Sequence, residues 1–98
     1  MDEKRIRIAL ERVLRDVQEK QGLRCPPLHA GVRPLKDLEQ FDSPMSIFAT
    51  AKIGRMLGIN IPDGKNIFGD GSGAFSLSQT VTLLSGLSRT NAPQKVEA

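Results

Sequence analysis

The chain has 98 residues, the length of one small domain, because two domains of half this size would each lack an adequate core. Trp and Tyr are absent and Phe occurs four times, so Leu, Ile, Val and Met must supply most of the interior, which favours packed helices over a β-sandwich. The net charge of +3 comes from basic residues interspersed with acidic ones, and no basic cluster with interleaved aromatics indicates a dedicated nucleic-acid surface.

The cysteine content and the first residues bear on the compartment. Cys25 is the single cysteine, which excludes an internal disulfide and suits a reducing environment. The opening Met-Asp-Glu-Lys-Arg has no apolar core of a secretory signal, and no apolar run approaches the length of a membrane span. We therefore expect a soluble, cytoplasmic monomer.

The first predicted element is an amphipathic helix over residues 3–20. Gly22 supplies a stop signal after it, with Lys20 in the last turn, where a cation suits the helix dipole. Apolar residues recur at i, i+4, i+7 and i+11, which places them on one helical face: Ile6, Leu10, Val13 and Val17.

A long connection is predicted over residues 23–40. Consecutive prolines, Pro26 and Pro27, exclude a regular helix there, although one helical turn could form at residues 35–39. Recurrent apolar residues indicate a loop anchored across the core: Leu23, Leu28, Val32, Leu35 and Leu38.

A second helix is predicted over residues 44–58. Asp42 and Ser43 suit the cap, Gly58 suits the left-handed residue after the helix, and Pro62 forbids continuation. The expected core face consists of Met45, Ala49, Ile53, Met56 and Leu57. A second strip, available for burial or for a partner, consists of Ile47, Phe48, Ala51 and Arg55.

The remaining chain is predicted to form a short third helix or turn at residues 63–68, a flexible glycine-rich loop at 69–73, and a last helix ending near Leu87. Ser76 and Gln79 have the spacing of a capping box. The apolar face of the last helix is Leu77, Val81 and Leu84. Residues 1–87 form the expected domain, and residues 88–98 a disordered tail.

Residue types alone do not indicate a self-contained active site. The loop at 69–73 lacks the Gly-Lys-Ser/Thr ending of a phosphate-binding loop. Cys25 and His29 are too few ligands for zinc and have no third group to orient the imidazole. Ser43 lacks the Gly-x-Ser-x-Gly context of a hydrolase nucleophile, so spacing alone predicts a helix cap.

The order of these features resembles that of an acyl or peptidyl carrier protein. An Asp-Ser pair, Asp42-Ser43, opens a helix after an amphipathic helix and a long linker, and an Ile-Pro-Asp sequence follows it. Pro62 lies 19 positions after Ser43, the usual interval in bacterial acyl carrier proteins. Leu38 and Phe41 are similar to the subgroup pattern Leu-x-x-Trp-Asp-Ser-Leu. The resemblance covers residues 3–87.

The resemblance implies an all-α, four-helix bundle with three main helices, a short third helix and a long loop between the first two. It implies that Ser43 receives 4′-phosphopantetheine from coenzyme A, transferred by a separate phosphopantetheinyl transferase with magnesium. The arm would hold an acyl or aminoacyl group as a thioester for a specialised lipid or secondary-metabolite pathway. Asp42 would cap the helix and aid transferase recognition. The chain would then be a substrate, with no catalytic residues or metal of its own.

Two departures from the carrier pattern change the expected partners. Pro44 replaces the usual Leu and should push Ser43 into the cap position, because proline disfavours the α conformation in the residue before it. Residues 44–61 contain Lys52 and Arg55 but no Asp or Glu, whereas the family usually has an acidic helix here. We expect acyl-loading and acyl-using enzymes with apolar or acidic docking surfaces, contacting Pro44, Ile47, Phe48, Ala51 and Arg55.

Two alternatives stay open at this point. The chain could be an interaction module with a carrier-like fold, in which Pro44 prevents modification and the second helix docks on a partner. It could also be a small basic helical protein that binds nucleic acid, in which case its association would depend steeply on salt.

Overall fold

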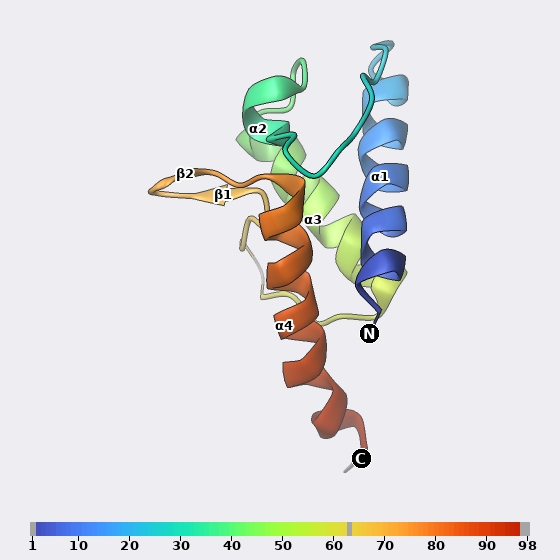
Figure 1. Cartoon of the computed structure of the whole chain (residues 1–98), viewed down its shortest axis with the longest axis vertical. Coiled ribbons are helices and arrows are strands. Elements are labelled where there is room, and N and C mark those ends of the chain that lie inside the picture. Colours follow the sequence, from blue (N-terminus) through green and yellow to red (C-terminus); the bar gives the residue numbers. More distant parts are fainter. Residues whose placement is uncertain (1, 63, 97–98) are drawn as a thin grey trace.

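The computed structural model describes residues 2–62 and 64–96, and the side chains of these residues as far as Ser88. The elements, in chain order, are α1 (Glu3–Lys20), α2 (Pro34–Asp37), α3 (Ser43–Leu57), β1 (Gly69–Asp70), β2 (Gly73–Ala74) and α4 (Leu77–Val96). Figure 1 shows α1 packed with α3 and α4, while the β1–β2 hairpin projects to one side. The predicted helical class is confirmed.

Helix α1 follows its predicted pattern closely. All four apolar residues of the predicted stripe are buried, with Ala9, Leu14 and Gln18 beside them. The carboxylate of Asp2 caps the helix by accepting a hydrogen bond from the Lys4 N–H at 3.1 Å. Gly22, just past the end, has the left-handed φ of 75° that its stop signal requires.

The connection between α1 and α3 is laid across the core, as predicted. Val32 and Leu38 are buried in it, and Leu28 and Leu35 pack partly against the core. The helical turn predicted at residues 35–39 forms one position earlier, as the four-residue α2.

Helix α3 occupies residues 43–57, one position earlier than predicted, and Gly58 ends it with φ 69°. The predicted core face is only partly correct, because Met56 is 42% exposed and Met45 is half-buried. Two hydroxyl residues, Ser46 and Thr50, take their place on the inner face. They were missed because their burial depends on hydrogen-bond partners from a distant segment.

Of the two alternatives predicted for residues 63–68, a short third helix or a turn, residues 64–68 adopt turns, and Asp63 lies outside the described residues. The short helix of this fold is instead α2, which precedes α3 in the chain. The glycine-rich loop is also more regular than predicted, because β1 and β2 pair antiparallel with Gly69 opposite Ala74. Ile67 and Phe68 are fully buried.

Helix α4 begins as predicted and ends later. The Ser76 N–H donates to the Gln79 side-chain oxygen at 2.8 Å, and the Gln79 N–H donates to the Ser76 hydroxyl at 3.2 Å, which confirms the capping box. The backbone continues as a helix past Leu87 to Val96, later than the predicted end near Leu87, while the division into a domain at residues 1–87 and a disordered tail at residues 88–98 stays a prediction. Residues 88–92 contain no Gly or Pro, and Ser88 is still buried, so packing and backbone freedom both allow the helix to continue as far as residue 92. The last two tail positions lie outside the described residues.

Candidate functional site

The first turn of α3 places Ser43 at the surface. Asp42 is the N-cap residue, with φ −89° and ψ −174°, and its carboxylate accepts a hydrogen bond from the Met45 N–H at 3.1 Å. Ser43 is the first residue of the helix and is exposed. The prediction that Ser43 occupies the cap position is therefore wrong. Since Pro44 stands at the second helical position, its missing N–H removes a donor that the helix would leave unpaired anyway.

A buried polar network lies beneath this turn and was not predicted from the sequence. The Ser46 hydroxyl donates to the Ser43 carbonyl at 2.8 Å and accepts from the side-chain amide of Asn66 at 2.6 Å. The Thr50 hydroxyl donates to the Ser46 carbonyl at 2.8 Å and accepts from the Ile67 N–H at 3.2 Å. The network therefore joins the start of α3 to the segment before the hairpin. Helical spacing of hydroxyl residues, at 46 and 50, was the available signal.

The network continues from this segment into α4. Thr80 is fully buried, and its hydroxyl donates to the Ile67 carbonyl at 3.0 Å and to the Ser76 carbonyl at 3.1 Å. Buried hydroxyls are costly unless they are hydrogen-bonded, so these contacts account for polar residues at positions that face the core.

The predicted docking residues share the outer side of α3. Pro44, Ala51 and Arg55 are exposed, and Ile47 and Phe48 are 42% and 47% exposed. Large apolar side chains exposed next to one another are unusual enough to suggest a contact surface. We call the strip Ile47, Phe48, Ala51 and Arg55 the outer strip of α3.

Two hollows border the outer strip, where the segment after α3 folds back along the helix. One, of about 170 Å³, includes Ile47 and Lys65. The other, of about 540 Å³, includes Arg55 and Asn60. Both are lined by Ala51 and Ile61, so they adjoin across these two residues. The surface beside the strip is therefore indented and not flat.

The cations of α3 differ in their surroundings. Lys52 donates to the Asp16 carboxylate at 2.6 Å and thereby joins α3 to α1, while Lys20 lies 3.4 Å from the same carboxylate. The hydrogen bond from Lys52 holds the pKa of Asp16 below its ordinary value, and Lys20 adds to the effect. Arg55 is exposed and has no ion pair with any residue that the structure describes. Arg55 is thus the cation of α3 that remains available to a partner.

The two residues considered for thiol chemistry are not assembled into a site. The Cys25 thiol donates to the carbonyl of Pro26 at 3.5 Å, and burial raises the pKa of this thiol, which favours the unreactive protonated form. His29 is exposed, and its Nδ1 accepts from the Gly31 N–H at 3.2 Å. Among residues 2–62 and 64–96, no cluster of His, Cys, Asp and Glu could hold a metal ion.

The glycine-rich turn between β1 and β2 satisfies its own polar groups. The carboxylate of Asp70 accepts hydrogen bonds from the hydroxyl and the N–H of Ser72, and these lower the pKa of Asp70. The Ser72 N–H is therefore already paired within the turn. This arrangement is that of a tight hairpin turn and offers no cradle of free N–H groups for a phosphate.

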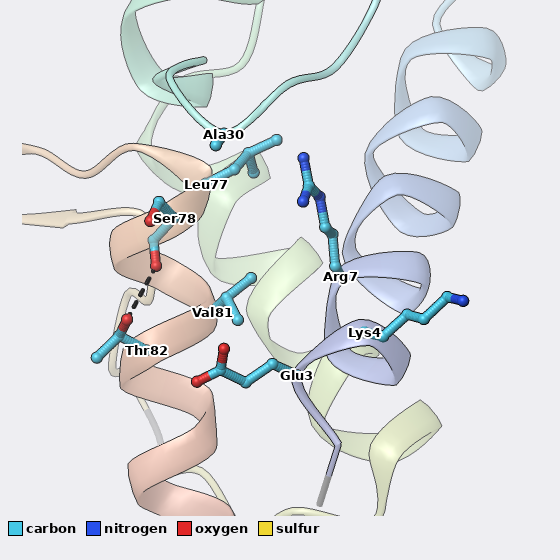
Figure 2. Close-up of a pocket in the computed structure, with 8 residues that line it drawn as sticks. All are labelled: Glu3, Lys4, Arg7, Ala30, Leu77, Ser78, Val81 and Thr82. Atoms are coloured by element: carbon cyan, nitrogen blue, oxygen red, sulfur yellow. Dashed lines mark hydrogen bonds between the residues drawn. The ribbon is translucent and has the colours of Figure 1, made fainter.

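A further hollow, of about 320 Å³, lies between α1 and the start of α4 (Figure 2). Its lining includes Leu77 and Val81, which are 2% and 9% exposed and so offer little apolar surface to a ligand. Arg7 extends upward into the space between α1 and α4, Glu3 points toward α4, and Lys4 points away (Figure 2). Arg7 is already paired with Glu11 at 3.6 Å. The hollow therefore has no strong electrostatic preference for a charged ligand.

Comparison of the chain with protein families, curated protein sequences and solved structures finds no match. Among the helices that the structure describes, none is long and apolar enough to cross a membrane.

Proposed function

We propose that this protein is an acyl carrier protein that holds an acyl or aminoacyl group as a thioester on a 4′-phosphopantetheine arm attached to Ser43. The observation that carries the proposal is the position of Ser43, exposed in the first turn of α3 directly after the capping residue Asp42. An exposed hydroxyl there is accessible to a separate phosphopantetheinyl transferase. The positive end of the helix dipole favours the phosphodiester that the transfer would create.

The chemistry of the transfer does not require a general base in this chain. The carrier is the substrate, and the transferase with its magnesium ion supplies activation of the hydroxyl and stabilisation of the phosphoryl charge. Asp42 holds the first turn in a helical conformation through its bond to the Met45 N–H, and it lies next to the acceptor serine. The absence of a catalytic histidine beside Ser43 is therefore compatible with the proposal.

The outer strip of α3 is the proposed docking surface for the enzymes that load and use the cargo. Ile47 and Phe48 lie four and five positions after Ser43, so a partner bound there would sit next to the arm. Arg55 at the far end of the strip favours partners that present a carboxylate beside an apolar centre.

The modification is tested by co-expressing the protein with a broad-specificity transferase and measuring intact mass. We expect the mass of one phosphopantetheine to be added to the wild type and not to Ser43→Ala. Ser78→Ala is the matched control, because Ser78 is an exposed serine in the first turn of α4. An unmodified wild type, or a modification that survives Ser43→Ala, would contradict the proposal.

The exposure of Ile47 and Phe48 also favours a second candidate, an unmodified interaction module that docks through α3. It predicts a wild type that stays unmodified and a partner complex that survives Ser43→Ala and is lost in Phe48→Asp. Ile8→Asp is the matched control, because Ile8 is an apolar residue on α1 that is 53% exposed. Equal loss of the complex in both Asp variants would contradict a specific role for the outer strip.

A further inference from the structure

The ends of a helix are the parts most prone to local opening, and at the start the first N–H groups have no partners within the helix. In α3 the start carries Ser43. The capping bond from Met45 to Asp42 joins two residues of the same turn and cannot tie that turn to the rest of the protein. A tertiary contact is needed to hold it in place.

The side chains of Ser46 and Asn66 supply such a contact. Ser46 is fully buried, and its hydroxyl proton is used in the bond to the Ser43 carbonyl, at 2.8 Å. The same oxygen accepts a hydrogen bond from Nδ2 of Asn66, at 2.6 Å, so its donor and one acceptor site are both used. Two consecutive hydrogen bonds therefore connect Asn66 to the backbone of Ser43.

Asn66 is itself anchored to the core. Its side-chain carbonyl accepts a hydrogen bond from the Phe68 N–H at 2.8 Å. Phe68 is fully buried, and its ring meets that of Phe41 edge to face, with 5.2 Å between the ring centroids. Because one end of the amide is held by a core residue, the other end points at Ser46 in a defined orientation.

We propose that Asn66 is a positioning residue for Ser43, acting through the Ser46 hydroxyl. It holds the first turn of α3 closed, so that the Ser43 hydroxyl is presented to the transferase in one arrangement. The part of the proposal that concerns transfer rests on the proposed function, whereas the restraint on the turn does not.

Amide hydrogen exchange measured by NMR tests the restraint without any modification. In Asn66→Ala, exchange of the Met45 and Ser46 amides should become roughly five- to tenfold faster, the factor that the net free energy of one hydrogen bond represents. The amide of Ile53, in the middle of α3, should change no more than global stability requires. Unchanged exchange at Met45 and Ser46 would overturn the proposal.

A second variant separates the two ends of the amide. Asn66→Asp keeps an oxygen for the Phe68 N–H but has no donor for Ser46, so it should accelerate exchange in the same turn. Because it preserves size and the core anchor, it remains informative if Asn66→Ala folds poorly. Exchange at the wild-type rate in well-folded Asn66→Asp would also overturn the proposal.

The transfer reaction tests the functional part. The kcat/KM of phosphopantetheine transfer, measured well below the unfolding midpoint, should fall roughly five- to tenfold in Asn66→Ala. Thr80→Val is the matched control, because it removes a buried hydroxyl at the other end of the network without touching the Ser43 turn. An equal fall in Thr80→Val would assign the effect to stability and overturn the positioning role.

A double-mutant cycle locates the effect in the shared bond. Ser46→Ala should slow transfer, and adding Asn66→Ala to it should produce little further loss, because both act through one hydroxyl. If the losses of transfer rate in the two single variants add up in the double variant, Asn66 does not act through the Ser46 hydroxyl. If the wild type accepts no phosphopantetheine, the proposed function fails, while the exchange measurements still decide whether Asn66 restrains the turn.

Discussion

Helices α1 and α3 pack against each other and use their faces in opposite ways. Helix α1 buries its large apolar residues in one stripe, except for Ile8, which is 53% exposed, and covers its other side mostly with charges. Helix α3 buries Ser46, Thr50 and Gly54 together with its apolar residues. At the same time it exposes Phe48 and Met56, at 47% and 42%.

This difference separates a helix that supports the fold from one that also presents a surface. Short and polar residues on the inner side of α3 let the following segment approach closely and hydrogen-bond to it. Large apolar residues on the outer side contribute little to folding while they are exposed. Their contribution is therefore expected in a complex, at the strip that begins one turn after Ser43.

The largest expected difference in the free energy of unfolding is between truncation of a buried residue and truncation of a residue in the outer strip. Leu14→Ala in α1 and Ile53→Ala in α3 should each lower the free energy of unfolding by about 3 kcal/mol, because both side chains are fully buried. Phe48→Ala removes a larger side chain but should cost under about 0.5 kcal/mol, because Phe48 is exposed. Urea denaturation measures all three. A cost for Phe48→Ala similar to that of Leu14→Ala would break the distinction between the two sides of α3.

A smaller loss of stability should follow when a methyl group is added at Gly54. A Cβ there would lie 3.1 Å from the Ile59 carbonyl oxygen and 3.2 Å from Cδ1 of Ile61. The Ile59 N–H donates to the Gly54 carbonyl at 2.9 Å, so this backbone cannot easily retreat. We expect Gly54→Ala to destabilise by about 1 kcal/mol, because overpacking outweighs the gain in helix propensity.

Gly86→Ala is the matched control for this substitution. Gly86 lies in α4, and a Cβ there would meet nothing within 4 Å, so the propensity gain stands alone. We expect stabilisation of up to about 1 kcal/mol, measured in the same denaturation experiment. If Gly54→Ala lowers the free energy of unfolding and Gly86→Ala raises it, the result supports the view that α3 is packed closely against the segment that follows it. Changes of the same sign in both variants would refute that view.

The smallest expected effect is the pH dependence of the bond between α1 and α3. The pKa of Asp16 is lowered mainly by its hydrogen bond from Lys52, so the stabilisation is present above the ordinary pKa of aspartate. It decreases as the pH falls below that value and is fully lost only below the lowered pKa of the folded state, where the native carboxylate takes up a proton. The difference in unfolding free energy between wild type and Lys52→Met should therefore shrink on acidification.

Asp16→Asn provides the background in which this pH dependence should vanish. The effect of Lys52→Met on the free energy of unfolding is measured in the wild-type and in the Asp16→Asn background. Each measurement is made by denaturation at neutral pH and at a pH below the ordinary pKa of aspartate. If Lys52→Met retains the same pH-dependent effect without the carboxylate, Asp16 is not its source. A Lys52 effect that is constant with pH would likewise remove Asp16 from the contact between the helices.

Much of the fold was predictable where the relevant residues are neighbours in the chain. The stripe of α1 and the Ser76–Gln79 capping box depend on spacings of three and four residues, and both formed as predicted. The anchoring of residues 23–40 also followed, because Val32 and Leu38 are buried in a connection where Pro26 and Pro27 exclude a long regular helix. The Asp-Ser start of α3 was located within one position.

The remaining features depended on contacts between distant residues. The periodicity of α3 allowed Met56 on the core face, and the structure placed it in solvent. A core face predicted from apolar residues alone leaves out a serine or threonine that is buried because its hydroxyl forms hydrogen bonds. Hairpin pairing at residues 69–74 and the continuation of α4 to Val96 were missed for a different reason, because glycine-rich and polar segments carry weak local signals.

The sequence by itself determined both ends of α1 and α3 and the start of α4, because caps, prolines and glycines act on the backbone within a few residues. Only the tertiary structure decided which side of α3 is buried. Ser46 and Thr50 can face inward because Asn66 and Ile67, about twenty positions later, meet their hydroxyls. Without those partners, the free-energy cost of burying two hydroxyls would exceed the favourable free energy of burying a methionine side chain. The same contacts leave Ser43 exposed in a turn tied to the core.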